Sequence, residues 1–363
     1  MFQAPLPDEY AALTEEQTRE RILTAKRTLG GRLLVLGHHY QRDEIIEHAD
    51  YRGDSFKLCK DANRHPDAKY IVFCGVHFMA ESADILTPDS QTVILPNLAA
   101  GCSMADMANL FQVRSAWTQL ENVVGPGKML PITYINSAAN LKAFVGERGG
   151  TVCTSTNAPK AVEWALQNAE KLIFFPDQHL GRNTGDKLGY DVEREMCLWD
   201  PFKPLGGCSP DDLKRSKFIL WKGHCSVHQR FTVEQVNEAR KRDPNVQVIV
   251  HPECPIEVVR LSDCAGSTEF IIKTVEQSPA GTSWAIGTEI NLVNRLANEN
   301  PDKKIWCLDS MICPCSTMYR IHPSFLCWAL ERIVEGDPAN VIQVPPKTKE
   351  FARIALDRML SLI

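Results

Sequence analysis

The sequence predicts an α/β protein built from parallel sheets. Short apolar runs, most of them rich in Val, Ile and Phe at successive positions, alternate with segments of helical period. Strands that are apolar on both faces are typical of sheets covered by helices on each side, and strand–helix alternation favours parallel pairing. The runs expected to form strands are Leu33–Leu36, Tyr70–Cys74, Thr92–Leu95, Leu130–Tyr134, Lys171–Phe175, Phe218–Trp221, Val246–Val250, Trp284–Gly287 and Ile305–Leu308.

Helical periodicity fills the segments between these runs. It predicts helices over Glu15–Leu29, Pro159–Ala169, Thr232–Arg242 and Thr268–Gln277. A stretch around 186–217, with "WDPFKPLGGCSPDD" at its centre, is rich in Pro and Gly and has little periodicity. We expect this stretch to be an insertion whose role the sequence does not indicate.

A weak internal repeat predicts the domain organisation. Three times, an expected strand runs into a turn that carries a Cys-Ser pair, at Cys102, Cys225 and Cys315; a fourth pair, Cys208-Ser209, lacks the strand. We therefore expect three similar α/β domains: 1–95, with helices of 320–363 packing back on it, then 96–215 and 216–319. Ligands of open α/β sheets bind outside the carboxyl ends of the strands, so a shared central site could collect the three cysteines.

Composition excludes several classes of partner. A formal net charge of −5 and scattered Lys and Arg give no basic surface for nucleic acid. No apolar run is long enough to span a membrane, and the N-terminal residues do not resemble a secretory signal. We expect a cytoplasmic protein with small-molecule substrates, in which most of the 13 cysteines are reduced thiols.

The cysteines allow more than one interpretation. Three thiolates and one open position suit a [4Fe-4S] cluster, but buried cysteines are more often plain core residues. Core packing is the expectation for Cys59, Cys74, Cys264, Cys307 and Cys327. The close pair Cys313 and Cys315 is weak evidence for zinc because no second pair lies at a suitable spacing.

Polar residues follow several of the expected strands. "GHHYQRDEI" supplies His38, His39 and Tyr40, "TYINSAA" supplies Tyr134, Asn136 and Ser137, and "VHPECP" supplies His251 and Glu253. A single strand end of this kind would indicate an ordinary surface histidine with hydrogen-bond partners. Several at the carboxyl ends of strands favour a pocket.

Three expected helix starts carry hydroxyl groups. They are at Ser55, at Ser155 with Thr156 and Asn157, and at Ser267 with Thr268. Routine helix capping explains each of them, while the functional alternative is that free N–H groups and hydroxyls bind phosphate or carboxylate. No glycine-rich nucleotide loop occurs, so a phosphate would belong to a small substrate.

The chain resembles the quinolinate synthase family along nearly its whole length. The matching motifs are "GHHYQRDEI", "GDSFKLCK", "CGVHFMAESADIL", "GCSMAD", "TYINSAA", "CTSTNA", "FFPDQHLGRNTG", "GHCSVHQRF", "VHPECP", "AGSTEFII" and "CPCSTM". The insertion is similar to that of the family's longer members. The resemblance implies three α/β/α domains with pseudo-threefold symmetry around one [4Fe-4S] cluster that has an open iron.

The resemblance also implies a reaction. Iminoaspartate, supplied by L-aspartate oxidase or aspartate dehydrogenase, condenses with dihydroxyacetone phosphate to give quinolinate, phosphate and water in NAD biosynthesis. A monomer or a homodimer is expected. Two rivals remain: a hydro-lyase of the aconitase kind, and an iron–sulfur or zinc sensor without catalysis.

Site residues follow from the motifs by resemblance. The cluster ligands would be Cys102, Cys225 and Cys315, with Cys313 close enough in sequence to compete with the last. Glu253, Tyr134 and His251 would be catalytic, and Asn136 would lie near the reacting carbons. His228 would support the residues that contact the substrate without contacting the substrate itself. His39 is assigned no role. The residues expected to bind substrate are His38, Tyr40, Ser55, Tyr134, Asn136, Ser155, His251, Glu253, Ser267 and Thr268.

Overall fold

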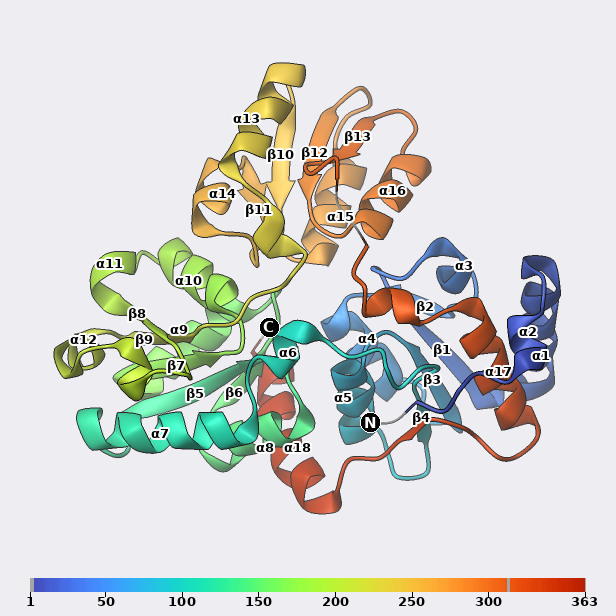
Figure 1. The fold of residues 1–363 in the computed structure, drawn as a ribbon, viewed down its shortest axis with the longest axis horizontal. Coiled ribbons are helices and arrows are strands. Elements are labelled where there is room, and N and C mark those ends of the chain that lie inside the picture. Colours follow the sequence, from blue (N-terminus) through green and yellow to red (C-terminus); the bar gives the residue numbers. More distant parts are fainter. Residues whose placement is uncertain (1–2, 312–313, 363) are drawn as a thin grey trace. The chain divides into compact units, whose positions relative to one another are not determined.

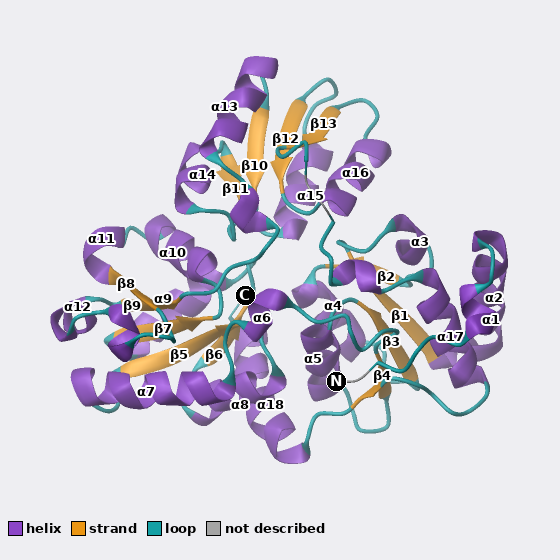
Figure 2. Cartoon of the chain, viewed as in Figure 1, coloured by secondary structure: helices purple, strands orange, loops and turns teal. Residues whose placement is uncertain are grey.

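The computed structural model describes residues 3–311 and 314–362 and confirms the α/β class (Figure 1, Figure 2). Three sheets carry the described strands. All of their pairings are parallel except that of β14 with β4. The first sheet has the order β14 (Val341–Ile342), β4 (Thr92–Ile94), β3 (Tyr70–Cys74), β1 (Leu33–His38), β2 (Tyr51–Gly53). The second has the order β6 (Thr151–Cys153), β5 (Met129–Tyr134), β7 (Lys171–Phe175), β9 (Phe218–Trp221), β8 (Met196–Trp199). The third has the order β11 (Cys264–Ala265), β10 (Gln247–Val250), β12 (Ser283–Gly287), β13 (Lys304–Cys307).

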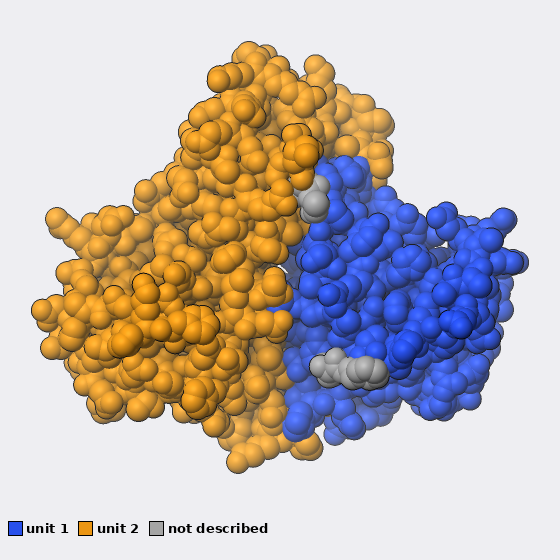
Figure 3. Space-filling view, in the orientation of Figure 1, with its two compact units in different colours: residues 1–102, 290–295, 313–345 blue, residues 103–289, 296–312, 346–363 orange. Residues whose placement is uncertain are grey.

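The chain divides into two compact units (Figure 3). Unit 1 comprises residues 1–102, 290–295 and 313–345 and holds the first sheet; unit 2 comprises 103–289, 296–312 and 346–363 and holds the other two. The helices of unit 1 are α1 (Asp8–Ala11), α2 (Glu15–Leu29), α3 (Asp43–Ile46), α4 (Ser55–Asn63), α5 (His77–Leu86) and α17 (Pro323–Val334). Helix α16 (Ile290–Glu299) contributes residues to both units.

Unit 2 contains most of the helices. They are α6 (Ser103–Asp106), α7 (Leu110–Val124), α8 (Ala139–Glu147), α9 (Ala158–Asn168), α10 (Gln178–Lys187), α11 (Val192–Glu195), α12 (Pro210–Arg215), α13 (Val233–Arg242), α14 (Ile256–Leu261), α15 (Thr268–Gln277) and α18 (Pro346–Ser361). Short 3₁₀ turns complete the fold: η1 (Gly30–Arg32) and η4 (Met318–Arg320) in unit 1, and η2 (Pro204–Gly207) and η3 (His228–Arg230) in unit 2.

Most central strands are buried along their whole length, as the sequence predicts. Every residue of β1, β3, β7, β9 and β12 is buried. In the second sheet, Figure 2 shows α7 and α8 on one side of the strands and α10 on the other. This two-sided cover explains why these strands are apolar on both faces.

The two C-terminal helices pack in different places. Helix α17 packs against α2 in unit 1, whereas α18 packs against α8 and β6 in unit 2. For 346–361 this differs from the expected packing on the first domain. Gly146 on α8 provides the physical reason, because a Cβ there would lie 2.0 Å from the carbonyl oxygen of Phe351. The glycine lets the two helix backbones approach closely.

Among the described residues, no helix combines the length and the apolar character that crossing a membrane requires. The pseudo-threefold arrangement and the boundaries of three domains stay predictions.

Candidate active site

The centre of the site is Glu253, a carboxylate that is buried in the turn after β10. The Cys254 N–H donates to the His251 carbonyl at 3.0 Å and closes this turn. From α10, the Asn183 side-chain amide donates to the carbonyls of Pro252 and Cys254, both at 2.8 Å. Since these carbonyls flank Glu253, Asn183 holds the backbone on both sides of it.

Three side chains from other segments contact the Glu253 carboxylate. The Tyr134 hydroxyl, at the end of β5, donates to Oε1 at 2.6 Å. The His228 ring donates from Nδ1 to Oε2 at 2.8 Å, and Nδ1 of His251 lies 3.8 Å from Oε1. The second and third sheets of unit 2 therefore meet at this carboxylate.

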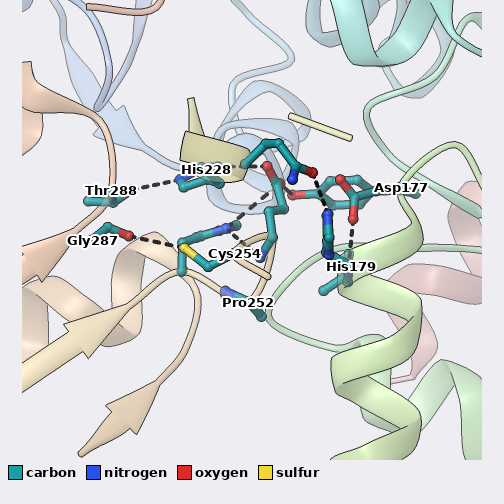
Figure 4. A network of polar contacts seen from close by, with 12 residues as sticks. Asp177, His179, His228, Pro252, Cys254, Gly287 and Thr288 are labelled. Atoms are coloured by element: carbon teal, nitrogen blue, oxygen red, sulfur yellow. Dashed lines mark hydrogen bonds and ion pairs between the residues drawn. The ribbon is translucent and has the colours of Figure 1, made fainter. Parts of the chain in front are cut away.

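His228 is held on both edges and on one face (Figure 4). Its Nε2 lies 3.0 Å from the Thr288 hydroxyl, which follows β12. Its ring stacks on His251, with 4.4 Å between centroids and 20° between planes. Tyr134, Glu253, His228 and Thr288 thus form a continuous chain of hydrogen bonds inside the protein.

Electrostatics favours the ionised form of Glu253. Burial by itself raises its pKa, but neighbouring His251 and His228 and the hydrogen bonds from His228 and Tyr134 lower the pKa below its ordinary value. For His251, burial lowers the pKa to about 3, so the ring is neutral at pH 7. The arrangement presents a carboxylate base beside a hydroxyl donor.

A second buried carboxylate, Asp177, lies at the start of α10 and accepts the Leu180 N–H at 2.6 Å (Figure 4). Burial and the charge of Glu253 raise its pKa, although hydrogen bonds from the Leu180, His179 and Cys225 N–H groups oppose this. Asp177 therefore holds the backbone at Cys225. The Cys225 sulfur, a His228 ring nitrogen and a Glu253 oxygen lie within 4.8 Å of one another.

Other predicted residues of unit 2 lie at carboxyl ends of strands. Asn136 follows β5, and its Oδ1 is a buried atom without a hydrogen-bond partner. Ser267 and Thr268 are buried at the start of α15, which follows β11 in the same sheet as β10. Ser155 is half-buried in the turn after β6. Asn157 has a structural role, because its amide donates to the Met359 carbonyl of α18 at 3.0 Å.

In unit 1 the structure brings together the polar ends of β1 and β2. The Tyr40 N–H donates to Nδ1 of His38 at 3.1 Å, and the two rings pack edge to face. His38 pairs with Gly53 of β2, and Ser55 opens α4 two residues later. These three side chains occur at the carboxyl edge of the first sheet. His39 is buried, and its N–H donates to the Gly53 carbonyl at 3.2 Å.

Two of the predicted cluster ligands also belong to unit 1. Asn97 donates to the Arg320 carbonyl and Arg320 donates to the Ala99 carbonyl, both at 3.0 Å. These bonds tie the segment that leads to Cys102 to the turn that follows Cys315. Cys313 lies outside the described residues.

The exposure of the cysteines is consistent with their expected roles. Cys102, Cys225 and Cys315 are half-buried, so a cofactor could reach their sulfurs, whereas Cys59, Cys74 and Cys327 are buried as expected. Core packing is confirmed for Cys307, which lies against the hydrophobic core of the third sheet, although neither Cys264 nor Cys307 is fully buried. Both are half-buried, because each belongs to a strand at an edge of the third sheet.

Parallel sheets with a buried Glu–His–Tyr cluster at their carboxyl ends define an α/β enzyme. A family model described as quinolinate synthetase A protein matches residues 20–361. Proteins named quinolinate synthase share 55% identity in Corynebacterium glutamicum and 50% in Bacillus subtilis. The first similarity covers 99% of this chain and 91% of the relative, and the second covers 98% and 96%. The chain belongs to the quinolinate synthetase A family.

Proposed function

We propose that this enzyme condenses iminoaspartate with dihydroxyacetone phosphate to form quinolinate, phosphate and water in NAD biosynthesis. The observation that carries the proposal is the buried Glu253 carboxylate, held between the Tyr134 hydroxyl and the His228 ring. The condensation requires enolisation and imine tautomerisation. Both need a group that accepts a proton and a second group that returns it.

Glu253 and Tyr134 can perform this proton transfer together. Glu253 is ionised and can accept a proton from a substrate carbon, while the Tyr134 hydroxyl can donate one. His228 steadies the negative charge of Glu253, and its contact with Thr288 orients the ring. Neutral His251 can donate to or accept from a substrate carboxylate beside Glu253.

The remaining polar residues would bind the substrates. His38, Tyr40 and Ser55 would hold carboxylates. Ser155, Ser267 and Thr268 would contact phosphate or carboxylate at helix starts, where N–H groups and the helix dipole favour anions. The unpartnered Oδ1 of Asn136 would accept a hydrogen bond from the substrate imine or a hydroxyl.

A [4Fe-4S] cluster would be held by Cys102, Cys225 and Cys315. The donor set fits, since these thiols are half-buried and thiolates are the usual cluster ligands. When bound, the cluster would supply a Lewis-acidic open iron that helps a substrate hydroxyl depart. Asp177 would hold the backbone at Cys225 by accepting a hydrogen bond from its N–H group.

The wider setting follows the same proposal. Iminoaspartate would come from L-aspartate oxidase or aspartate dehydrogenase in the cytoplasm, and the enzyme would act as a monomer or homodimer. The residues would be arranged in the three domains expected from the sequence, related by pseudo-threefold symmetry.

The Glu253→Gln variant tests the assignment. Anaerobically purified protein is given iminoaspartate and dihydroxyacetone phosphate, and quinolinate is measured. Because Gln cannot accept the proton, turnover should fall by about 10²–10⁴-fold, with iron and sulfide content unchanged. Glu276→Gln, on the exposed side of α15, is the matched control and should retain full activity. Near-normal turnover of Glu253→Gln would remove the proton-transfer role.

A further inference from the structure

The insertion contains two cysteines, Cys197 and Cys208, that lie beside each other. Cys197 lies on β8, and Cys208 follows η2. The Cys208 thiol donates to the Leu198 carbonyl at 3.3 Å, which places it beside Cys197, and each thiol shifts the pKa of the other. Both side chains are half-buried. Neither belongs to the candidate active site.

The backbone of the insertion explains why these residues meet. Leu205, Gly206 and Gly207 all have positive φ, at 49°, 64° and 79°, which turns the chain sharply back. At Gly206 a Cβ would lie 2.4 Å from the Trp199 ring, so the loop packs tightly over the end of β8.

Backbone hydrogen bonds hold this loop closed. The Asp200 N–H donates to the Gly206 carbonyl at 2.9 Å, and the Cys208 N–H donates to the Leu205 carbonyl at 3.0 Å. The chain therefore returns to β8 directly after Gly207, and the next residue, Cys208, lies beside Cys197. The contact is a consequence of a packed turn.

We propose that Cys197 and Cys208 form a reversible intramolecular disulfide by exchange with a small-molecule disulfide such as oxidised glutathione. A disulfide requires sulfurs that approach without backbone movement, and the Cys208 sulfur already lies against the strand residue that follows Cys197. The site is a redox modification site in the insertion. It is independent of the proposed catalytic chemistry.

The exchange balances in two steps. The Cys208 thiolate attacks one sulfur of the small disulfide, which forms a mixed disulfide and releases one small thiolate. The Cys197 thiolate then attacks the Cys208 sulfur and releases the second. The protein dithiol is oxidised, the small disulfide is reduced, and two small thiols carry away the protons. Neighbouring Cys197 lowers the pKa of Cys208, which favours Cys208 as the first nucleophile.

The bond would tie the insertion to the edge of the second sheet. Among the described strands, β8 pairs only with β9, and Trp199 lies opposite Trp221 at the ends of the two strands. β9 leads to the turn that carries Cys225. A covalent loop closure restricts the unfolded chain, so oxidation should raise the temperature of thermal unfolding by a few degrees.

Anaerobic exchange of the full-length, cluster-loaded protein tests the proposal. The protein is incubated with oxidised glutathione, remaining thiols are alkylated, and an unreduced digest is examined by mass spectrometry. We expect one peptide pair joined through Cys197 and Cys208, which separates after dithiothreitol. Cys264→Ser, which removes another half-buried thiol of unit 2, should leave that pair unchanged.

The two single variants distinguish this route from random oxidation. Cys197→Ser should accumulate glutathione on Cys208 because the resolving thiol is missing, and Cys208→Ser should form no pair. Full alkylation of both thiols in the wild type after exposure to oxidised glutathione would overturn the proposal. So would a stable glutathione adduct on wild-type Cys208, or a link from Cys208 to a different cysteine.

Discussion

The chemistry of the site depends on how one carboxylate is surrounded. Glu253 is 3% exposed, and a buried charge is tolerated only when polar partners replace water. Tyr134 and His228 provide those partners, while Asn183 holds the turn on both sides. The result is a base that is ionised, shielded from water and fixed in direction.

Thr288→Val should reduce turnover by about 10–100-fold, which is typical for groups that orient a functional histidine. The substitution removes the hydroxyl that contacts Nε2 of His228 while preserving side-chain shape. The kinetic constants kcat and KM separate the effects, because kcat should fall with little change in KM. Thr118→Val, at an exposed position of α7, serves as the control. An unchanged kcat for Thr288→Val would show that His228 needs no support from Thr288.

Several of these residues could be predicted from the sequence. Tyr134, His251 and Glu253 stand at the ends of apolar runs, where ligands of parallel sheets bind, and the structure brings them together. Thr288 was missed although "AIGTEI" carries the same signal of a polar residue after a strand. Asn183 could not be predicted from local pattern, because its role depends on carbonyls that lie 69 and 71 positions away.

Among the elements, the central strands could be predicted, and so could the edge strand β13, whereas the other edge strands could not. Strands β3, β7 and β9 have the bounds that their apolar runs predict. The unpredicted strands β2, β6, β8, β11 and β14 all lie at sheet edges. Strands β2, β6, β11 and β14 contain only two or three residues, too few for a periodic signal, and pairing with a neighbour defines them. Strand β8 has four residues but lies in the insertion, where periodicity is weak.

Gly146→Ala should destabilise the protein by about 1–3 kcal/mol, as overpacking in a close contact typically does. The added Cβ would meet the Phe351 carbonyl oxygen, a backbone atom that cannot rotate away. Urea unfolding measures the loss of free energy. Gly31→Ala is the matched control, since a Cβ there has nothing within 4 Å. Equal stability of the two variants would contradict the close packing of α8 against α18.

Glu331 joins three helices of unit 1. It accepts hydrogen bonds from Tyr10 of α1 at 2.8 Å and from Nε of Arg21 of α2 at 2.8 Å. Burial raises the pKa of Glu331, but the hydrogen bonds from Arg21 and Tyr10 lower this pKa by a larger amount, so the net shift is downward. A depressed pKa in the folded state means that the ionised carboxylate stabilises the fold.

Glu331→Gln should therefore cost about 1–2 kcal/mol of unfolding free energy at pH 7 for this partly exposed group. The stabilisation is present above the unfolded pKa, about 4.3, and is lost as pH falls through the lower folded pKa. Urea unfolding across this range should show the wild type and the variant converging in acid. Glu9→Gln, an exposed position of α1, should show no pH-dependent difference. A gap between Glu331→Gln and wild type that persists in acid would exclude this ionisation as its source.

The whole molecule combines repeated architecture with one specialised chemistry. Each of the three sheets has polar residues at the carboxyl ends of its strands. The predicted cysteine ligands follow a strand or precede a short turn. The alternation of apolar runs with helical segments predicted the class of fold, and the repeat of strand, turn and Cys-Ser predicted three domains, which stay a prediction. Neither pattern predicted that the insertion would bring Cys197 to Cys208, because that approach depends on a positive φ at Leu205, which a non-glycine residue rarely adopts, beside the two glycines.

We infer that this enzyme makes quinolinate with a [4Fe-4S] cluster held by Cys102, Cys225 and Cys315. The most direct measurement is quinolinate formation from iminoaspartate and dihydroxyacetone phosphate by anaerobically purified wild type and Cys225→Ala, with the cluster absorption recorded on the same samples. The wild type should be brown and form quinolinate, and Cys225→Ala should lose both properties. A Cys225→Ala protein that keeps its cluster and full activity, or a cluster-loaded wild type that forms no quinolinate, would contradict this inference.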